Sequence, residues 1–302
     1  MTVTDSCLRI PVVFAVDTNY VVGTGVAICS LLMVASDELY DFFILHSSDL
    51  KISDRDAITN DVARLSPHSR VSFIEMGDDF NDAYTEKWFG ISCYYRLMIP
   101  WIIPNYSKVI YSDSDIIFKT SLKNLFETFE LEDSYVAGIN YDRFQDPKSQ
   151  IYDHIIDMGL SPKEYINSGF ILINNDLQRQ HNLLEKYKKL MYLKHQCPDQ
   201  DVLNKVCKGR ISYIDHGYNV YPGLKKNKTR KDKVLHYIGR HKPWTSLTWR
   251  WNEWAKVYKQ TSFFEPAFYR DMKKKRIKNM FRKPIQYSYS LLHRVYRSLI
   301  KV

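Results

Sequence analysis

Short apolar runs alternate with amphipathic segments along the first half of the chain. Runs rich in β-branched and aromatic residues predict buried strands at residues 10–17, 41–46, 71–76 and 108–115. The segments between them have the apolar spacing of helices, at residues 21–35, 53–65 and 92–103. Ser53 is predicted to cap the second helix, and Pro104 to end the third. Continuous apolar strands separated by helices favour a parallel sheet covered by helices on both faces.

The second half has a less regular pattern. Further strands are predicted at residues 136–140, 165–174, 211–215 and 234–239, and further helices at residues 177–194 and 199–207. A basic polar loop covers residues 225–233, and a linker-like break falls near Glu265 and Pro266. These features predict an α/β domain over residues 1–265 and a separate tail over residues 266–302.

Composition is typical of a soluble globular protein, with 45% hydrophobic and 25% charged residues in a chain of 302. The five cysteines form no CxxC pair, which favours a reducing cytoplasm over a disulfide framework or a zinc site. The N-terminus lacks the basic region of a secretory signal. The apolar run at residues 25–35 is shorter than the ~20 residues that span a bilayer, so we expect no membrane crossing.

Positive charge is concentrated at the C-terminus. Residues 270–302 contain eleven of the 43 Lys and Arg residues but one of the 34 Asp and Glu residues. From Pro284 onward, apolar residues recur at helical spacing opposite basic ones. This pattern predicts an amphipathic helix that binds the anionic surface of a membrane. The same composition is also compatible with nucleic-acid binding or with a helix packed on the body.

Two aspartates interrupt the apolar segment KVIYSDSDIIF. Asp113 and Asp115 are two residues apart, so on a strand their side chains would share one face. Two adjacent carboxylates repel each other unless they share a proton or a cation, and oxygen ligands suit Mg²⁺ or Mn²⁺. The alternative is that one aspartate begins a turn and the other caps Lys119 or Lys123. The motif alone does not decide between these interpretations.

Six segments together resemble glycosyltransferase family 8. They are FAVDTNY, YYRL, KVIYSDSDIIF, YINSGFILIN, DQDVLN and HYIGRHKPW, and they occur in the family's order between Ile10 and Trp244. The resemblance implies a retaining GT-A enzyme that uses a nucleotide sugar: a mixed, mainly parallel sheet flanked by helices, here with a basic C-terminal tail. Among family members, the chain is most similar to bacterial lipopolysaccharide and lipooligosaccharide galactosyl- and glucosyltransferases.

The resemblance assigns a metal and diphosphate site. Asp113, Asp115 and His236 would bind Mn²⁺, with Mg²⁺ as the alternative, and Lys242 would hold the diphosphate. Gly239 would let the backbone approach a phosphate closely. Taken without the resemblance, His236 reads as a packed strand histidine and Lys242 as a solvated loop residue.

The resemblance also assigns the donor-binding residues. Asp17 and Asn19 would read the uracil edge, and Tyr20 would either stack on the base or be an ordinary aromatic at a strand end. Arg96 would lie over the donor sugar and diphosphate, the alternative being a charge on a helix surface. Ser114, between the two aspartates, is placed with the donor-binding residues.

Three residues match family positions around the transferred hexose. Asn167 and Asp199 would contact the sugar, and Gln200 would lie near its anomeric carbon. Because an amide is a poor nucleophile, we favour substitution on one face of the sugar, with Asp199 as the alternative nucleophile. Asp199 also reads as the N-terminal cap of a helix. Either Asn140 or Asp142 aligns with an acidic residue of the family, so the sequence does not separate galactose from glucose.

The predicted function is transfer of a galactose or glucose from a UDP-sugar to a lipid-linked bacterial surface glycan, such as the lipopolysaccharide core. We expect a cytoplasmic protein, peripheral on the inner face of the cell membrane, with no nucleic-acid partner. Two alternatives remain. One is a phosphohydrolase with an aspartate nucleophile, which is disfavoured because that motif normally lies in the first strand. The other is a membrane- or RNA-binding adaptor on a catalytically inactive transferase fold.

Overall fold

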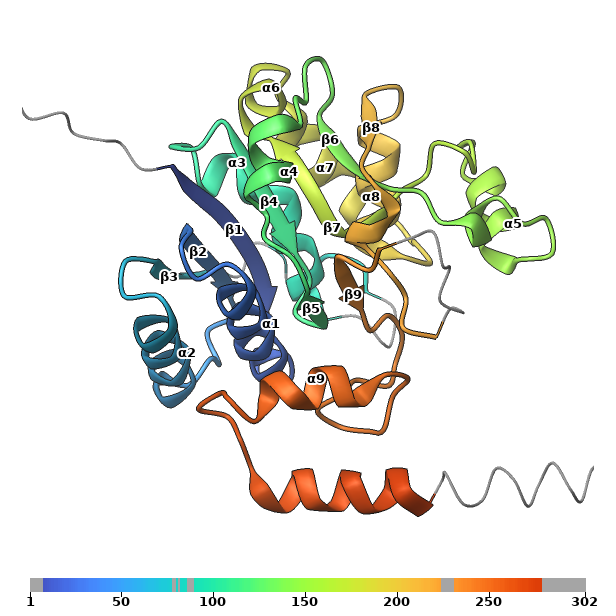
Figure 1. Ribbon diagram of the computed structural model, residues 1–302. Helices are drawn as coiled ribbons and strands as arrows, with labels where there is room; N and C mark the ends of the chain where they lie inside the picture. Colours follow the sequence, from blue (N-terminus) through green and yellow to red (C-terminus); the bar gives the residue numbers. More distant parts are fainter. Residues whose placement is uncertain (1–7, 78–79, 81, 86–89, 224–230, 279–302) are drawn as a thin grey trace, which may run out of the picture.

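The computed structural model describes residues 8–77, 80, 82–85, 90–223 and 231–278. Within them, seven strands form a sheet in the order β3-β2-β1-β4-β7-β6-β8 (Figure 1). In that order the strands are Arg70–Glu75, Leu39–His46, Arg9–Val16, Lys108–Ser112, Asn167–Asn174, Val136–Ile139 and Ile211–Tyr213. β5 (Ile116–Phe118) and β9 (Val234–His236) pair separately as an antiparallel ribbon.

The sheet is mixed and mainly parallel. β1 pairs in parallel with β2 and β4, and β2 with β3, as the continuous apolar runs predict. β7 runs antiparallel between β4 and β6. This arrangement confirms the predicted fold class. It also brings the start of β7 beside the end of β4, since Ser112 pairs with Phe170.

Helices cover both faces of the sheet. One face packs on α1 (Val21–Val34) and α2 (Ile52–Leu65), with Phe14, Phe42 and Ile28 in the shared core. The other face packs on η2 (Ile91–Met98), α7 (Leu183–Met191) and α8 (Pro198–Val206), with Tyr111, Tyr94 and Tyr187 in its core. The remaining named helices are α3 (Ile99–Ile102), α4 (Lys123–Thr128), η3 (Asp142–Phe144), α5 (Gln150–Asp157), α6 (Asn175–Gln180), η4 (His216–Tyr218) and α9 (Trp251–Tyr258).

Three predicted helices differ in detail from the observed ones. α2 begins after Lys51 without a side-chain cap, so the capping role predicted for Ser53 is wrong. The predicted helix 92–103 is mostly a 3₁₀ helix that continues into a single α-turn, where Pro100 lacks the N–H of a longer α-helix. The predicted helix 177–194 is divided into α6 and α7 at Asn182, whose φ of 47° is left-handed.

The C-terminal part of the described chain packs below α1. Residues 251–258 form α9, and a further helix covers residues 266–278 (Figure 1). Trp251 stacks on Tyr269 with ring centroids 5.7 Å apart, and Met272 is buried in the same cluster. The predicted amphipathic helix after Pro284 and most of the basic loop 225–233 lie outside the described residues. Across the ranges described, no helix has both the length and the apolar character required to cross a membrane.

Candidate active site

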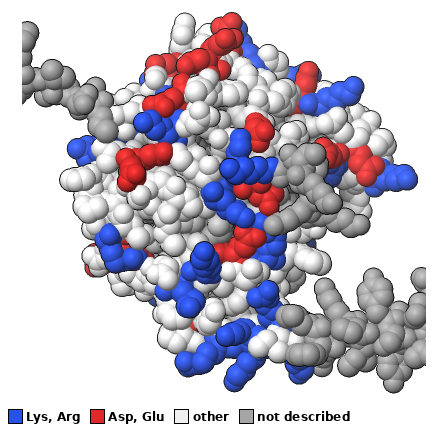
Figure 2. Space-filling model, viewed as in Figure 1, with Lys and Arg blue, Asp and Glu red and all other residues white. Residues whose placement is uncertain are grey.

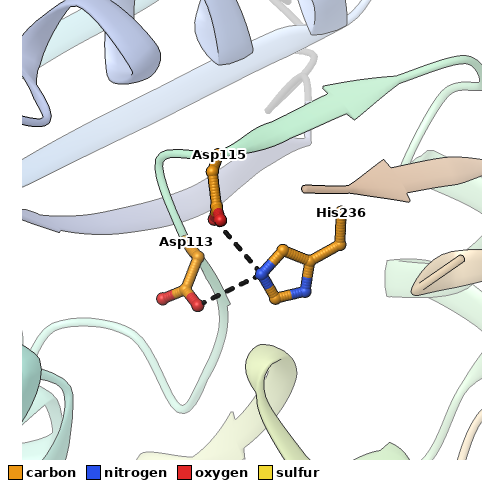
Figure 3. Close-up of side chains that lie close together, drawn as sticks. All are labelled: Asp113, Asp115 and His236. Atoms are coloured by element: carbon orange, nitrogen blue, oxygen red, sulfur yellow. Dashed lines mark ion pairs between the residues drawn. The ribbon is translucent and has the colours of Figure 1, made fainter. Parts of the chain in front are cut away.

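Asp113 and Asp115 lie in the connection between β4 and β5. They are not inside one continuous strand, as the sequence predicted, because β4 ends at Ser112 and β5 begins at Ile116. The Asp113 N–H donates to Gly169 O, and the Ser114 hydroxyl accepts from Thr24 of α1 at 2.8 Å. Both carboxylates nevertheless face the same point (Figure 3). The donor contact assigned to Ser114 stays a prediction, since its side chain is buried against α1.

His236 of β9 completes a group of three ligand-type side chains. The β5–β9 ribbon pairs Ile116 with His236, which places the imidazole Nε2 3.2 Å from Asp115 Oδ1 and 3.5 Å from Asp113 Oδ2 (Figure 3). The three ligand atoms all lie within 4.8 Å of one another. Two carboxylates and one imidazole form a donor set that Mn²⁺ or Mg²⁺ accepts.

Charge shifts the pKa values in this group strongly. Burial alone would raise the pKa of Asp113, but the Arg96 guanidinium and His236 outweigh it and hold that pKa below its ordinary value. Lys242 and His236 likewise keep the pKa of Asp115 low despite burial. The two carboxylates raise the pKa of His236 to about 9, against the effect of burial. Both carboxylates are therefore ionised at neutral pH, as metal ligands must be.

Gly169 of β7 leaves room for two of these side chains, His236 and Asp113. A Cβ at this position would lie 2.2 Å from His236 Cε1 and 2.5 Å from Asp113 Oδ2. Any other residue would displace the imidazole or the carboxylate. A glycine is thus required at this point by the packing of the candidate ligands, which fits a site kept open for a divalent ion.

Arg96 connects this group to Asp199. Its Nη2 lies 2.9 Å from Asp113 Oδ1 and its Nε lies 3.2 Å from Asp199 Oδ2. The guanidinium is buried, stacks over the Tyr111 ring at 4.4 Å and donates to Ser168 O. The alternative that Arg96 is a charge on a helix surface is therefore wrong.

Asp199 and Gln200 lie in the first turn of α8 and face the start of β7. Asp199 Oδ2 accepts from the Ser168 hydroxyl at 2.8 Å. Gln200 Oε1 accepts from Asn167 Nδ2 at 2.8 Å and from the Ser168 N–H at 3.2 Å. Burial raises the pKa of Asp199 although Arg96 opposes this shift. The N-cap of α8 is Cys197, so the capping interpretation of Asp199 is wrong.

Lys242 forms one border of the metal-ligand group. Its Nζ contacts Asp115 Oδ2 at 2.5 Å and lies 5.7 Å from the centroid of the Tyr20 ring. Tyr20 in turn meets Trp244 edge-on, with centroids 5.6 Å apart. Lys242 is thus partly buried and paired, and the alternative of a solvated loop lysine is wrong. Gly239 precedes it with a φ of 104°, a conformation that favours glycine.

The two residues predicted to read uracil lie at the end of β1. Asp17 Oδ1 accepts from the Asn19 N–H at 2.8 Å, and Asn19 O accepts from Trp244 Nε1 at 2.8 Å. Burial raises the pKa of Asp17, assisted by Asp49. The N-terminal motif and the KPW motif, more than 200 residues apart in sequence, therefore meet at this edge of the sheet.

The pattern of the whole chain matches one family. The model of glycosyl transferase family 8 matches residues 11–248, which is most of the chain. The chain belongs to glycosyl transferase family 8. It is therefore a glycosyltransferase, which rules out the predicted alternative of a phosphohydrolase. The predicted adaptor on an inactive fold is not favoured, because the candidate site has the residue types that the family resemblance requires.

Several curated relatives share most of their length with this chain. A protein of Haemophilus influenzae, provisionally named a glycosyltransferase, is 31% identical over 253 residues, 77% of this chain and 72% of the relative. The lipopolysaccharide glucosyltransferase WaaO of Escherichia coli strain K12 is 27% identical over 259 residues, covering 80% of this chain and 74% of WaaO.

Solved structures support the GT-A fold. The galactosyltransferase LgtC, in complex with donor and acceptor sugar analogues, aligns over 86% of this chain and 99% of its own, with a TM-score of 0.72 and 23% identity. The bifunctional glycosyltransferase WbbM aligns over 89% of this chain with a TM-score of 0.71 and 24% identity, although this chain spans 52% of WbbM. At these identities the likeness shows the fold alone.

Some residues of this family 8 site could not be found from the sequence. Asn219 is buried and contacts His236 and Asn167, but it lies outside the sequence motifs that carry the family resemblance. Ser168 follows Asn167 directly and could have been included with it. The sequence leaves open whether Asn140 or Asp142 takes the family's acidic position; in the structure Asn140 Nδ2 donates to the backbone oxygens of Pro162 and Tyr165.

Proposed function

We propose that this family 8 enzyme transfers a galactose or glucose from a UDP-sugar to a lipid-linked glycan, with retention of anomeric configuration. The observation that carries the proposal is the group of Asp113, Asp115 and His236, with the Lys242 ammonium at its border. Two curated relatives support the substrate class, since they are named lipopolysaccharide 1,2-glucosyltransferase and lipopolysaccharide 1,3-galactosyltransferase.

The donor set fits a divalent ion, with Mn²⁺ preferred and Mg²⁺ as the alternative. Asp113, Asp115 and His236 would hold it, and Gly169 leaves the room that Asp113 and His236 need. Such an ion supplies positive charge that offsets the negative charge of a departing diphosphate.

Protein cations provide the remaining charge for the diphosphate. Lys242 would exchange its contact with Asp115 for a phosphate oxygen, as a flexible point charge can. Arg96 has a different role, because both Asp113 and Asp199 hold its guanidinium in place. It would present a fixed cation beside the sugar and diphosphate. Tyr20, Asp17 and Asn19 lie together at the end of β1, as a base-binding site for UDP requires.

The polar side chains on α8 favour substitution on one face of the sugar. Gln200 carries no charge, and its Oε1 is already occupied by two N–H donors. Asp199 Oδ2 is bonded to Ser168 and Arg96, which lowers its nucleophilicity. These side chains are suited to hydrogen-bond sugar hydroxyls and to stabilise positive charge at the anomeric carbon. The leaving phosphate would then help to remove the proton from the acceptor hydroxyl.

The C-terminal helix supports a membrane-bound acceptor. Residues 266–278 expose Arg270, Lys273, Lys274, Lys275, Arg276 and Lys278, and Figure 2 shows basic side chains gathered over this end of the molecule. Asp271 pairs with Lys275 at 2.8 Å and is the only acidic residue within 270–278. The other basic residues of this helix therefore give its surface a net positive charge. We propose that it holds the enzyme on the anionic inner face of the cell membrane, where a lipid-linked acceptor would be reached.

A hydrolysis assay with Asp113→Asn tests the proposed function. Wild-type enzyme should cleave UDP-galactose or UDP-glucose slowly in the presence of Mn²⁺, without an acceptor. Asp113→Asn should lower this activity by about 100-fold or more, because one charged ligand of the proposed metal ion is removed. The matched control is Asp157→Asn, on the exposed end of α5, which should retain wild-type activity. Equal activity of Asp113→Asn and wild type would contradict the proposal.

A further inference from the structure

A continuous series of side-chain hydrogen bonds joins His236 to Gln200. His236 Nδ1 lies 2.8 Å from Asn219 Oδ1, and Asn219 Nδ2 donates to Asn167 Oδ1 at 2.8 Å. Asn167 Nδ2 then donates to Gln200 Oε1 at 2.8 Å. The series therefore links a candidate metal ligand to the amide assigned to the anomeric carbon, through two buried or half-buried asparagines.

Two backbone N–H groups fix the direction of this series. The Ser168 N–H donates to Gln200 Oε1 at 3.2 Å, and the Gly169 N–H donates to Asn167 Oδ1 at 3.1 Å. A backbone N–H can only donate, so the atoms that face these groups must be amide oxygens. Gln200 Oε1 and Asn167 Oδ1 are thereby set, and each amide nitrogen must point the other way.

The donor-to-acceptor direction of these hydrogen bonds also fixes the orientation of the Asn219 amide. Because Asn167 Oδ1 is an acceptor, Asn219 must present its Nδ2 to it and its Oδ1 to the other side. On that side Oδ1 accepts from the Tyr141 hydroxyl and faces His236 Nδ1. Asn219 Oδ1 carries no hydrogen and requires a donor there, so the imidazole keeps its proton on Nδ1 once metal binding has displaced the proton on Nε2. Its Nε2 lone pair is then directed at Asp113 and Asp115, where a metal ligand must present it.

The main chain also holds Asn219 in place. His236 N donates to Val220 O at 2.9 Å, and Val220 bridges to Leu235, so Asn219 is carried beside the β9 histidine. Asn219 is 1% exposed, so bulk solvent does not compete for its amide. Asn219 thus has neither a solvent contact nor a free orientation.

The Gln200 end of the series is anchored as well. Gln200 Nε2 donates to the Tyr165 hydroxyl at 3.0 Å, and that hydroxyl donates to Asp201. The Asp201 carboxylate is fully buried and also binds His154 Nε2 at 2.8 Å. A buried carboxylate can only accept from a hydroxyl, so it fixes the Tyr165 proton and leaves the Tyr165 oxygen to accept from Gln200. Both ends therefore impose the same direction.

We propose that Asn219 is a positioning residue which sets the His236 tautomer and, together with the Gly169 N–H, holds the Asn167 side chain that donates to Gln200. It would couple the metal site to the residue that faces the transferred sugar. This inference rests on the metal role of His236 under the proposed function. It adds a residue outside the motifs that carry the family resemblance.

Two substitutions separate the two halves of this role. Asn219→Ala removes the acceptor for His236 and the donor for Asn167 together. It should weaken Mn²⁺ binding by about 10–100-fold, as loss of a hydrogen-bond partner of a metal-bound histidine does. Asn219→Asp keeps an acceptor for the imidazole but cannot donate to Asn167. It should bind Mn²⁺ within about threefold of wild type and yet lower the kcat of UDP-sugar hydrolysis at least about tenfold, with little change in KM.

The measurement is Mn²⁺ binding by electron paramagnetic resonance in the presence of UDP, together with hydrolysis kinetics, on the full chain. Asn175→Ala is the matched control, because Asn175 is an equally buried asparagine that binds the backbone oxygens of Ile103 and Tyr106. It should lose stability but retain wild-type Mn²⁺ affinity.

Each outcome has one meaning. Wild-type Mn²⁺ affinity in folded Asn219→Ala, or wild-type kcat in Asn219→Asp, overturns the inference. If Asn219→Ala does not fold, Asn219→Asp decides alone. Absence of Mn²⁺ binding by the wild-type protein would contradict the proposed metal role of His236 itself, and the inference with it. Separate losses in the two variants support the coupling.

Discussion

Arg96 Nη2 lies 2.9 Å from Asp113 Oδ1, although the two residues come from η2 and from the β4–β5 connection. The same guanidinium reaches Asp199 on α8. One buried cation thus joins the candidate metal ligands to the side chains assigned to the sugar. The two halves of the proposed chemistry are connected by charge as well as by the amide series through Asn219.

Replacing Arg96 should affect stability and activity together. Arg96→Met would leave Asp199 buried without its cation, and breaking a buried pair costs about 3–5 kcal/mol of the free energy of unfolding. Arg96→Lys keeps the charge but loses the planar fork, so it should fold better and still transfer sugar poorly. Urea unfolding and hydrolysis assays measure both effects. Arg143→Met is an exposed control, and equal losses in this variant would contradict the assignment.

Gly169→Ala should disrupt the metal site selectively. The new methyl group would overlap His236 and Asp113, and so the ligands must move. We expect Mn²⁺ affinity to fall by about tenfold or more, with the far-ultraviolet spectrum unchanged. Gly77→Ala is the control, because a Cβ there meets no atom within 4 Å and should leave binding intact. Unchanged Mn²⁺ affinity in Gly169→Ala would mean that the ion is held elsewhere.

The stability of the metal-free protein should depend on pH through His236. Its carboxylate neighbours raise its pKa from 6.5 to about 9 in the folded state. The protonated imidazole therefore stabilises the fold fully below pH 6.5, and this contribution is lost as pH rises through about 9. Urea unfolding in EDTA should show the decrease over this window. His236→Gln should remove this decrease, and an identical pH dependence in both proteins would refute the charge assignment.

The exposed basic residues of helix 266–278 should determine binding to anionic vesicles. A triple variant with Lys273→Glu, Lys274→Glu and Arg276→Glu should lower partitioning onto phosphatidylserine vesicles more than tenfold, since each basic residue contributes about 1 kcal/mol near such a surface. The control reverses three exposed lysines of α7, namely Lys186, Lys188 and Lys189. If both triple variants lose binding equally in co-sedimentation, net charge rather than this helix is responsible.

Local sequence was a good guide to the strands and a weaker one to the connections between them. The apolar runs at residues 10–17 and 41–46 lie within two residues of β1 and β2, because buried parallel strands need continuous apolar sequence. The break at Asn182 and the bend at residues 113–115 had no such signal. Both depend on how neighbouring elements pack, which periodicity does not report.

The candidate site shows the same division between residues that motifs in the sequence predict and residues that only the fold brings together. Asp113, His236 and Lys242 were found because each belongs to a motif with a recognisable order, and the structure brings them together. The carboxylates of Asp113 and Asp115 point to the same place, as predicted, but the predicted reason is wrong. A bend between two strands aligns them, and not the alternation of side chains along one strand. Asn219 was missed because its neighbours come from sheet pairing far along the chain. Contacts of this kind are visible only once the fold is known.

A thermal-shift titration tests the central claim most directly. Wild-type protein would be heated with UDP-galactose, UDP-glucose and control nucleotide sugars, each with Mn²⁺ and with EDTA. Ligands that bind the folded state raise the melting temperature by mass action. The account predicts an increase with one of the two UDP-hexoses that requires Mn²⁺ and is absent in Asp115→Asn. No increase with any UDP species in the presence of Mn²⁺ would contradict it.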